Sequence, residues 1–379
     1  MTSASSDTSG GSAGSGGRCR SGSIGAVNDS TTVSLADLTT LRLGGPAAEF
    51  VQATTEAELV HAVSDADARG VPVLLVAGGS NLVVADAGFD GLVVRVATRG
   101  VVADTAPGET SCGGAVVRVA AGENWDDFVA TAVRNGWSGV EALSGIPVSV
   151  GATPVQTVGA YGQEVASLIA QVRTRDRKEG AQRTFTASEC EFSYRHSRFK
   201  AELDRYLILE VTFQLPTASL GAPVGYSELA RALDLQVGER APAGRVREQV
   251  LALRRGKGMV LDEADHDSWS AGSFFTNPFL DADVAAALPE DAPRFPQADG
   301  RVKTSAAWLI ERAGFAKGFS PATTGGRVSL STKHTLALTN RGGASAEDLL
   351  VLAREVRDGV QARFGVRLVN EPVFVGLSL

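Results

Sequence analysis

The stretch SGIPVSVGATPVQTVGAYGQE, from Ser144 to Glu164, follows neither a helical nor a strand period. Small residues separate its glycines, and we single out Gly145, Ser149, Gly151, Ala152, Thr153, Gly159, Ala160, Tyr161 and Gly162. A long irregular stretch inside a compact domain is uncommon and usually functional. Main-chain N–H groups beside small side chains suit an extended anionic cofactor. The alternative interpretation is an irregular surface connection.

A second glycine-rich segment comes earlier in the chain. In VLLVAGGSNLVV (73–84), an apolar run that predicts a buried strand leads directly into Gly78, Gly79, Ser80 and Asn81. Glycines let the backbone approach a ligand closely, and consecutive N–H groups can bind a phosphate. A tight turn between two strands is the alternative. Since neither segment matches a Walker loop or GxGxxG, the two together predict a dinucleotide held by backbone amides outside a Rossmann fold.

The composition narrows the class of protein. The chain has 379 residues, of which 44% are apolar and 21% charged, and a net charge of -7, which argues against nucleic-acid binding. No run reaches the roughly 18 apolar residues of a membrane span. The cysteines Cys19, Cys112 and Cys190 are far apart and predict neither a zinc site nor a disulfide framework. A cytoplasmic setting is therefore expected, with a disordered Ser/Gly-rich tail over residues 1–26.

Local signals predict the scaffold. Apolar runs predict strands over 71–76, 91–97 and 115–120. Capping residues predict helices that start after Thr55, Asn124 and Ser345 and stop near Gly70, Gly136 and Gly365. The segment 216–246 is turn-rich, and we interpret it as an insertion or lid. The terminal VRLVNEPVFVGLSL (366–379) predicts a strand, with a turn at 370–372, that docks on an earlier domain.

Several further motifs carry a resemblance to a known family. They occur in the family's order and cover roughly residues 35–379: LRLGGPA (41–47), AGGSNLVV (77–84), GIPVSVGATPVQTVGAYG (145–162), YRHSRFK (194–200), SAGSFFTNP (270–278), KTSAAWLIERAGFAKG (303–318) and NEPVFVG (370–376). On these motifs the chain resembles the UDP-N-acetylenolpyruvoylglucosamine reductases, flavoenzymes of peptidoglycan precursor synthesis. It departs from the family pattern at Val148, where a glycine is usual, and at Thr157, where an asparagine is usual.

The resemblance implies an α+β fold, with an FAD-binding domain pair of the vanillyl-alcohol-oxidase (PCMH) type and a C-terminal α+β substrate-binding domain. The expected boundaries are 27–97 plus 367–379, 98–245 and 246–366. The implied cofactors are FAD and NADPH, and the implied substrate is a UDP-sugar enolpyruvyl ether that becomes a lactyl ether. A monomer is expected. A side chain at Val148 could crowd the cofactor's pyrophosphate.

The resemblance also implies three catalytic residues. Arg195 matches the family's catalytic arginine, whose planar fork can bind a carboxylate through two hydrogen bonds. Glu371 matches the catalytic glutamate, and a carboxyl group in so apolar a strand is expected to favour its neutral form and donate a hydrogen bond. Ser273 matches the proton donor. Without the resemblance, a surface ion pair, a solvent-facing carboxylate and a turn or N-cap hydroxyl are the alternatives.

The implied substrate contacts are Tyr226, Lys257, Asn277 and Lys303, with Tyr226 closing over the diphosphate. For the basic residues of LRRGKG (253–258), a solvated helix end is the alternative. Another FAD enzyme on the same fold, such as an alcohol or sugar oxidase, is the rival function. Such oxidases often hold flavin covalently through histidine or cysteine, and no histidine lies in the glycine-rich segments. A catalytically inactive flavin- or nucleotide-binding protein is a further alternative.

Overall fold

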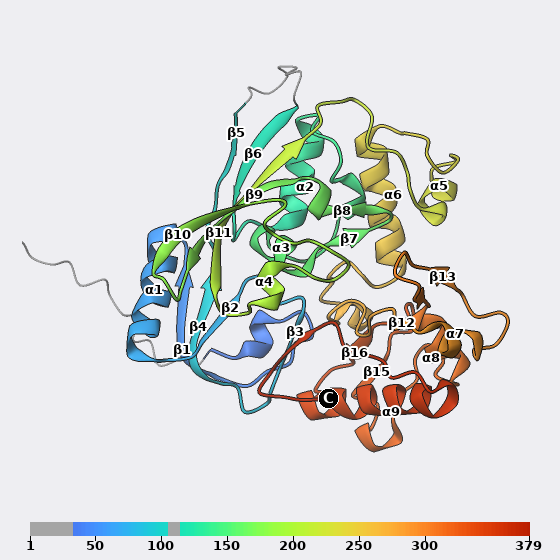
Figure 1. The fold of residues 1–379 in the computed structure, drawn as a ribbon. Coiled ribbons are helices and arrows are strands. Elements are labelled where there is room, and N and C mark those ends of the chain that lie inside the picture. The colour runs from blue at the N-terminus through green and yellow to red at the C-terminus, as the bar shows by residue number, and fades with distance from the viewer. Residues whose placement is uncertain (1–32, 105–113) are drawn as a thin grey trace, which may run out of the picture. The chain divides into compact units, whose positions relative to one another are not determined.

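The computed structural model describes residues 33–104 and 114–379, which belong to one compact unit, Thr32–Leu379 (Figure 1). The predicted tail at 1–26 and the cysteines Cys19 and Cys112 lie outside the described residues. Cys190 is a buried free thiol.

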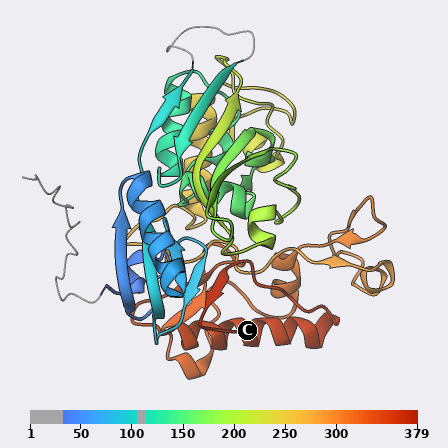
Figure 2. The same ribbon diagram turned by 60° about the vertical axis from the view of Figure 1, so that its left-hand side comes forward.

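The glycine-rich segment 73–84 begins in a parallel sheet of order β1-β4-β2, made of Ala47–Ala53, Phe89–Val96 and Val73–Val76. Helix α1 (Glu56–Arg69) packs on this sheet (Figure 2), where Leu59 and Val63 join a cluster with Leu92 and Val94. The predicted capping box is present, because the hydroxyl of Thr55 accepts from the N–H of Glu58. The short elements η1 (Leu35–Leu38) and β3 (Leu82–Val84) flank the segment.

A five-stranded antiparallel sheet forms the next layer. Its order is β10-β9-β11-β6-β5, with bounds Ala181–Thr186, Ile169–Asp176, Tyr206–Leu215, Ala115–Ala120 and Val101–Ala103. Helix α2 (Trp125–Arg134) covers it, and its Phe128 ring stacks on Phe213 with 5.1 Å between centroids. Asn124 caps α2 as predicted, through the N–H of Asp127.

The stretch 144–164 is less irregular than the sequence suggested. It and its flanks contain η2 (Glu141–Leu143), η3 (Val150–Ala152), α3 (Thr153–Gln156), β7 (Gly159–Ala160), β8 (Gln163–Glu164) and η4 (Val165–Ser167). These elements are too short for a periodic pattern to reveal. Thr157 ends α3 in the left-handed region at φ 47°, which is an outlier for a β-branched residue. Val148 is not among the described residues with positive φ, so its backbone does not require glycine.

The segment predicted to be turn-rich (216–246) also contains helix. Helices α5 (Ser227–Ala232) and α6 (Ala243–Gly256) pack through a small apolar cluster that includes Leu229, Val246 and Val250. The short helix α4 (Arg198–Ala201) precedes β11. The segment expected to be an insertion thus contains α5 and only the first turn of α6, on which α5 packs.

The C-terminal part builds its own core around α9 (Ala346–Phe364), which runs beside β15 and β16 (Figure 1). Its other elements are η5 (His266–Ser268), β12 (Phe279–Leu280), α7 (Ala282–Ala286), β13 (Phe295–Pro296), β14 (Val302–Lys303), α8 (Ala306–Arg312), η6 (Ala322–Thr324), β15 (Val328–Leu330) and β16 (Leu338–Asn340). The predicted capping box of Ser345 and Asp348 and the stop at Gly365 are both present.

The chain end returns to the first domain, as predicted. Strand β17 (Val373–Val375) pairs in parallel with β3, and the N–H of Ala85 donates to the carbonyl of Val375 at 3.0 Å. Only three residues of the terminal segment are strand, so the predicted strand was too long. The residues just before β17 contact a different segment and belong to the site described below.

The cap of α9 predicts a pH dependence of stability. The Arg327 guanidinium is the main group that lowers the pKa of Asp348 from the usual 3.8. Hydrogen bonds from Ser345 also lower this pKa, which lies at about 2. The ionised carboxylate therefore stabilises the folded protein. This stabilisation is complete above the unfolded-state pKa and is lost as pH falls from about 4 toward 2. In Asp348→Asn, we expect the free energy of unfolding to be lower at pH 6 and the deficit to shrink toward pH 2. Urea unfolding over this range measures it, and a deficit independent of pH would contradict the assignment.

Candidate active site

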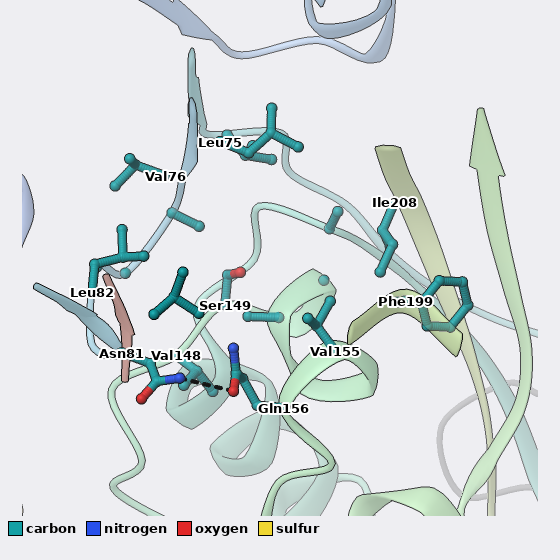
Figure 3. A pocket seen from close by; sticks show the side chains of 18 of the residues that line it. Leu75, Val76, Asn81, Leu82, Val148, Ser149, Val155, Gln156, Phe199 and Ile208 are labelled. Carbon is teal, nitrogen blue, oxygen red and sulfur yellow. Dashed lines mark hydrogen bonds between the residues drawn. The ribbon is translucent and has the colours of Figure 1, made fainter. Parts of the chain in front are cut away.

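The two glycine-rich segments face each other across a cavity of about 240 Å³ (Figure 3). Leu75 and Val76 of β2 lie on one side of it and Val155, Phe199 and Ile208 on another. Seven of the residues predicted at the cofactor line this cavity: Gly78, Gly79, Ser80, Asn81, Ser149, Gly151 and Ala152. The segments thus meet in space, as a shared ligand requires.

The glycines here are required by close backbone approach. A Cβ at Gly78 would lie 2.6 Å from the carbonyl oxygen of Pro147, and one at Gly79 would lie 1.8 Å from that of Leu38. The N–H groups of Gly78, Gly79 and Ser80 have no hydrogen-bond acceptor among the described residues. Consecutive free N–H groups at the wall of a cavity suit a diphosphate. The residues present therefore fit FAD.

A second cavity, of about 190 Å³, adjoins the first. Ser80, Asn81, Val148 and Gln156 line both. At this common wall the Asn81 side-chain amide donates to the side-chain oxygen of Gln156 at 2.8 Å (Figure 3). Val148, the departure from the family pattern, thus lies at the junction of the cavities, where it is 8% exposed.

The structure brings the three predicted catalytic residues together. Arg195, Ser273 and Glu371 all line the second cavity. Nε of Arg195 lies 2.8 Å from Oε1 of Glu371, with side chains 27% and 16% exposed. The N–H is not aligned well enough for a hydrogen bond, so this contact is an ion pair. Nη1 of Arg195 donates to the carbonyl of Thr157 at 3.2 Å. Glu371 therefore faces a cation instead of the apolar surroundings expected from the sequence.

Main-chain contacts fix Ser273 beside Glu371. The N–H of Glu371 donates to the carbonyl of Phe274 at 2.8 Å, and the N–H of Thr276 donates to that of Val369 at 3.0 Å. Phe274 and Phe275 are 1% exposed and anchor the segment in the C-terminal core. The Ser273 hydroxyl, on a partly buried residue, has no hydrogen-bond partner in the described chain. The capping alternative for this serine is therefore wrong.

Arg254 is the second basic residue lining this cavity. Its Nη2 donates to the carbonyl of Met259 at 2.7 Å, but its buried Nε has no partner among the described residues. Burial lowers the pKa of Arg254, against the charges of Tyr161 and Asp126. A buried, incompletely paired guanidinium suits an anionic ligand. The sequence put Arg254 in a basic group and did not distinguish it from its neighbours.

Asn277 and Lys303 lie near the catalytic group. Oδ1 of Asn277 accepts the N–H of Ala306 at 2.9 Å, at the start of α8. Nζ of Lys303 lies 3.7 Å from the ring centroid of Tyr194, the residue before Arg195. Burial, and then the charge of Arg195, lower the pKa of Lys303. Neither side chain lines either cavity.

Tyr226 and Lys257 form a second group with Tyr161. The rings of Tyr226 and Tyr161 meet edge to face with 5.8 Å between centroids, and Tyr226 is 48% exposed. Nζ of Lys257 lies 5.5 Å from the Tyr161 centroid and 2.5 Å from Oε2 of Glu228. None of these side chains lines either cavity.

Of the remaining residues predicted at the cofactor, only one lines a cavity. Gly159 lines the second cavity, whereas Gly145, Thr153, Ala160, Tyr161 and Gly162 line neither. The Gly145 N–H donates to Asp126 at 2.6 Å, and the Thr153 hydroxyl donates to the carbonyl of Val150 at 2.7 Å. Gln156, at the junction, was missed by sequence reasoning because nothing in its local pattern marks it.

Within residues 33–104 and 114–379, no group of three or more His, Cys, Asp or Glu side chains could hold a metal ion. No helix in the same ranges combines the length and apolar character that crossing a bilayer needs.

Comparisons with known proteins agree with this geometry. Family models match an FAD binding domain at residues 47–184 and the UDP-N-acetylenolpyruvoylglucosamine reductase C-terminal domain at residues 263–375. The reductase of Cutibacterium acnes is 58% identical over 347 residues, covering 92% of this chain and 90% of the relative. That of Streptomyces coelicolor is 54% identical over 356 residues, covering 91% and 90%.

A solved structure of the reductase from Thermus caldophilus matches with a TM-score of 0.61 and 26% identity, covering 91% of this chain and 98% of that one. The fold and the adjoining cavities thus define a flavin-dependent oxidoreductase with an FAD-binding domain and a separate C-terminal domain. The chain belongs to the UDP-N-acetylenolpyruvoylglucosamine reductase family.

The glycine contacts predict the effect of a single methyl group on cofactor retention. In Gly78→Ala, the new Cβ would press on the Pro147 carbonyl and separate the two glycine-rich segments. We expect at least a tenfold loss of FAD affinity, which corresponds to about 1.4 kcal/mol, measured by flavin absorbance on titration of the apoprotein. Gly244→Ala is the control, since its nearest contact would be at 4.0 Å. Equal affinity in both variants would disprove the assignment of the first cavity.

Proposed function

We propose that this protein reduces the enolpyruvyl group of UDP-N-acetylglucosamine enolpyruvate to the lactyl ether of UDP-N-acetylmuramate, with NADPH as the hydride source, in peptidoglycan precursor synthesis. The observation that carries the proposal is that Arg195, Ser273 and Glu371 line one cavity that adjoins the cavity of the glycine-rich segments. We further propose that it works as a cytoplasmic monomer.

The glycine-rich segments would hold FAD, which accepts hydride from NADPH and passes it to the substrate. The free N–H groups of Gly78, Gly79 and Ser80 would bind its phosphates, with Asn81, Ser149, Gly151 and Ala152 completing the wall. The residues that do not line the cavities would act by shaping the loops. Neither cavity is lined by a histidine or cysteine of the described chain, so covalent attachment, as in the rival oxidases, has no support.

The residues of the second cavity suit the second half of the reaction. Hydride addition at one carbon of the double bond leaves an electron pair at the carbon beside the carboxylate, and this charge needs fixed cations. Arg195 would bind the substrate carboxylate with its remaining N–H groups, while Glu371 holds its guanidinium in place. Arg254, through its unpartnered Nε, would add a second positive charge at the same cavity.

The Ser273 hydroxyl would supply the proton that completes the reduction. A serine is a weak acid, so it can protonate only a strongly basic centre, and the carbanion is one. Two cations lining the same cavity would stabilise the alkoxide until solvent returns the proton. Because the hydroxyl has no competing acceptor in the described chain, it is free to point toward a bound substrate.

The diphosphate and sugar would be bound outside the catalytic group. Tyr226 and Lys257 lie together beside Tyr161, and Asn277 and Lys303 lie near Tyr194 and Arg195. Lysine and tyrosine side chains supply the positive charge and hydrogen bonds that a nucleoside diphosphate requires.

The proton-donor role gives a direct test. In Ser273→Ala, we expect NADPH to reduce the flavin at the wild-type rate, while turnover with the enolpyruvyl substrate falls by at least a hundredfold, within the range for loss of a positioned acid. Anaerobic stopped-flow absorbance separates the two half-reactions. Thr276→Ala, on the same segment, is the control. Wild-type turnover in Ser273→Ala would rule out the role, and slowed flavin reduction would show general damage.

A further inference from the structure

Several positive charges gather around Lys257. Burial first, and then the charges of Lys257, Lys317 and Arg254, lower the pKa of His334 to about 4, while Glu228 acts in the opposite sense. Burial raises the pKa of Tyr161, and the charges of the same Lys257, Arg254 and Glu228 also act on it. Lys257, Lys317 and Arg254 thus act on one small region against Glu228, with Asp126 acting on Arg254, and such a group of cations suits an anionic ligand.

Glu228 is the partner of the lysine proposed to meet that ligand. Its Oε2 lies 2.5 Å from Nζ of Lys257, and both side chains are 32% exposed. Lys257 is the C-cap residue of α6, and Glu228 lies in the first turn of α5. Both groups are partly accessible to solvent, so the pair can be broken without exposing a buried charge.

The helix that carries Glu228 also carries Tyr226 at its N-cap. Besides the ion pair, it is held to α6 by apolar contacts through Leu229 and Ala230, which are 1% and 2% exposed, and by a hydrogen bond from Arg245 to the carbonyl of Leu233. Since these other contacts remain when the carboxylate is neutralised, we expect Tyr226 and Lys257 to keep their places. The function of the Glu228 charge can therefore be tested apart from the fold.

We propose that Glu228 is an internal competitor of the substrate: it holds the Lys257 ammonium in the free protein and must give it up to the diphosphate. This inference rests on the proposed function. A carboxylate and a phosphate oxygen are both acceptors for the same ammonium, and two anions side by side repel. The ion pair keeps the Lys257 side chain ordered before the substrate binds. It also lowers the affinity of Lys257 for the nucleotide diphosphate.

The test is equilibrium binding of UDP, which cannot react, to the FAD-loaded enzyme by titration calorimetry at low ionic strength. Partly exposed ion pairs contribute modestly, so we expect Glu228→Gln to lower the dissociation constant about two- to fivefold. Lys257→Gln should raise it, and in Glu228→Gln/Lys257→Gln the gain from Glu228→Gln should vanish. Glu347→Gln is the control: it removes the same charge from an exposed pair with Arg354 and should leave UDP binding unchanged.

Unchanged or weaker binding in Glu228→Gln would overturn the inference, as would an equal gain in the Lys257→Gln background. If the wild-type enzyme binds UDP and reduces the enolpyruvyl substrate but Glu228→Gln gains nothing, this inference alone fails. If the wild-type enzyme retains FAD and binds no UDP, the proposed substrate class fails with it.

Discussion

The return of the chain end is the constraint on which the site depends. Residues 369–371 pair with the segment that follows Ser273, and β17 pairs with β3 immediately afterwards. These contacts tie the C-terminal core to the glycine-rich segment of the first domain. Because the N–H of Glu371 is fixed to the carbonyl of Phe274, Glu371 and Ser273 are held beside one short strand contact and line the same cavity.

The two guanidinium groups that line the second cavity have incomplete partners. Arg195 faces Glu371 without an aligned hydrogen bond, and Arg254 has a buried Nε with no acceptor in the described chain. Leaving a buried guanidinium unsatisfied costs stability unless a ligand completes it. Lys257 is paired with Glu228, and because both side chains are partly exposed, solvent makes an exchange of partners easier. The site is thus arranged for an anion that brings several acceptors at once.

Much of the scaffold could be predicted from sequence, because its signals are local. The caps of α1, α2 and α9 are set by residues within one turn of each helix start. The short elements in 141–167 and helix α5 were not predicted, because a run of two to six residues is too short to show a hydrophobic period. The left-handed backbone of Thr157 is also unusual for a β-branched residue, and its carbonyl accepts a hydrogen bond from the distant Arg195.

In the candidate site, too, the sequence predicted which residues take part but not how they contact one another. Motif resemblance identified Arg195, Ser273 and Glu371, and the structure brings them to one cavity. It could not show that Glu371 faces Arg195, that Arg254 lacks a partner, or that Tyr161 lies with Tyr226 instead of at the cofactor cavity. These are contacts between distant segments, which no local pattern encodes.

The central claim is that the serine and the glutamate act as one unit, because one main-chain contact fixes both. The most direct measurement is the turnover number at saturating substrate for Ser273→Ala, Glu371→Gln and the double variant. Residues that act as a unit are strongly non-additive, so the double variant should be about as slow as the slower single variant. Losses that multiply would mean that the two side chains act independently, and would contradict the account.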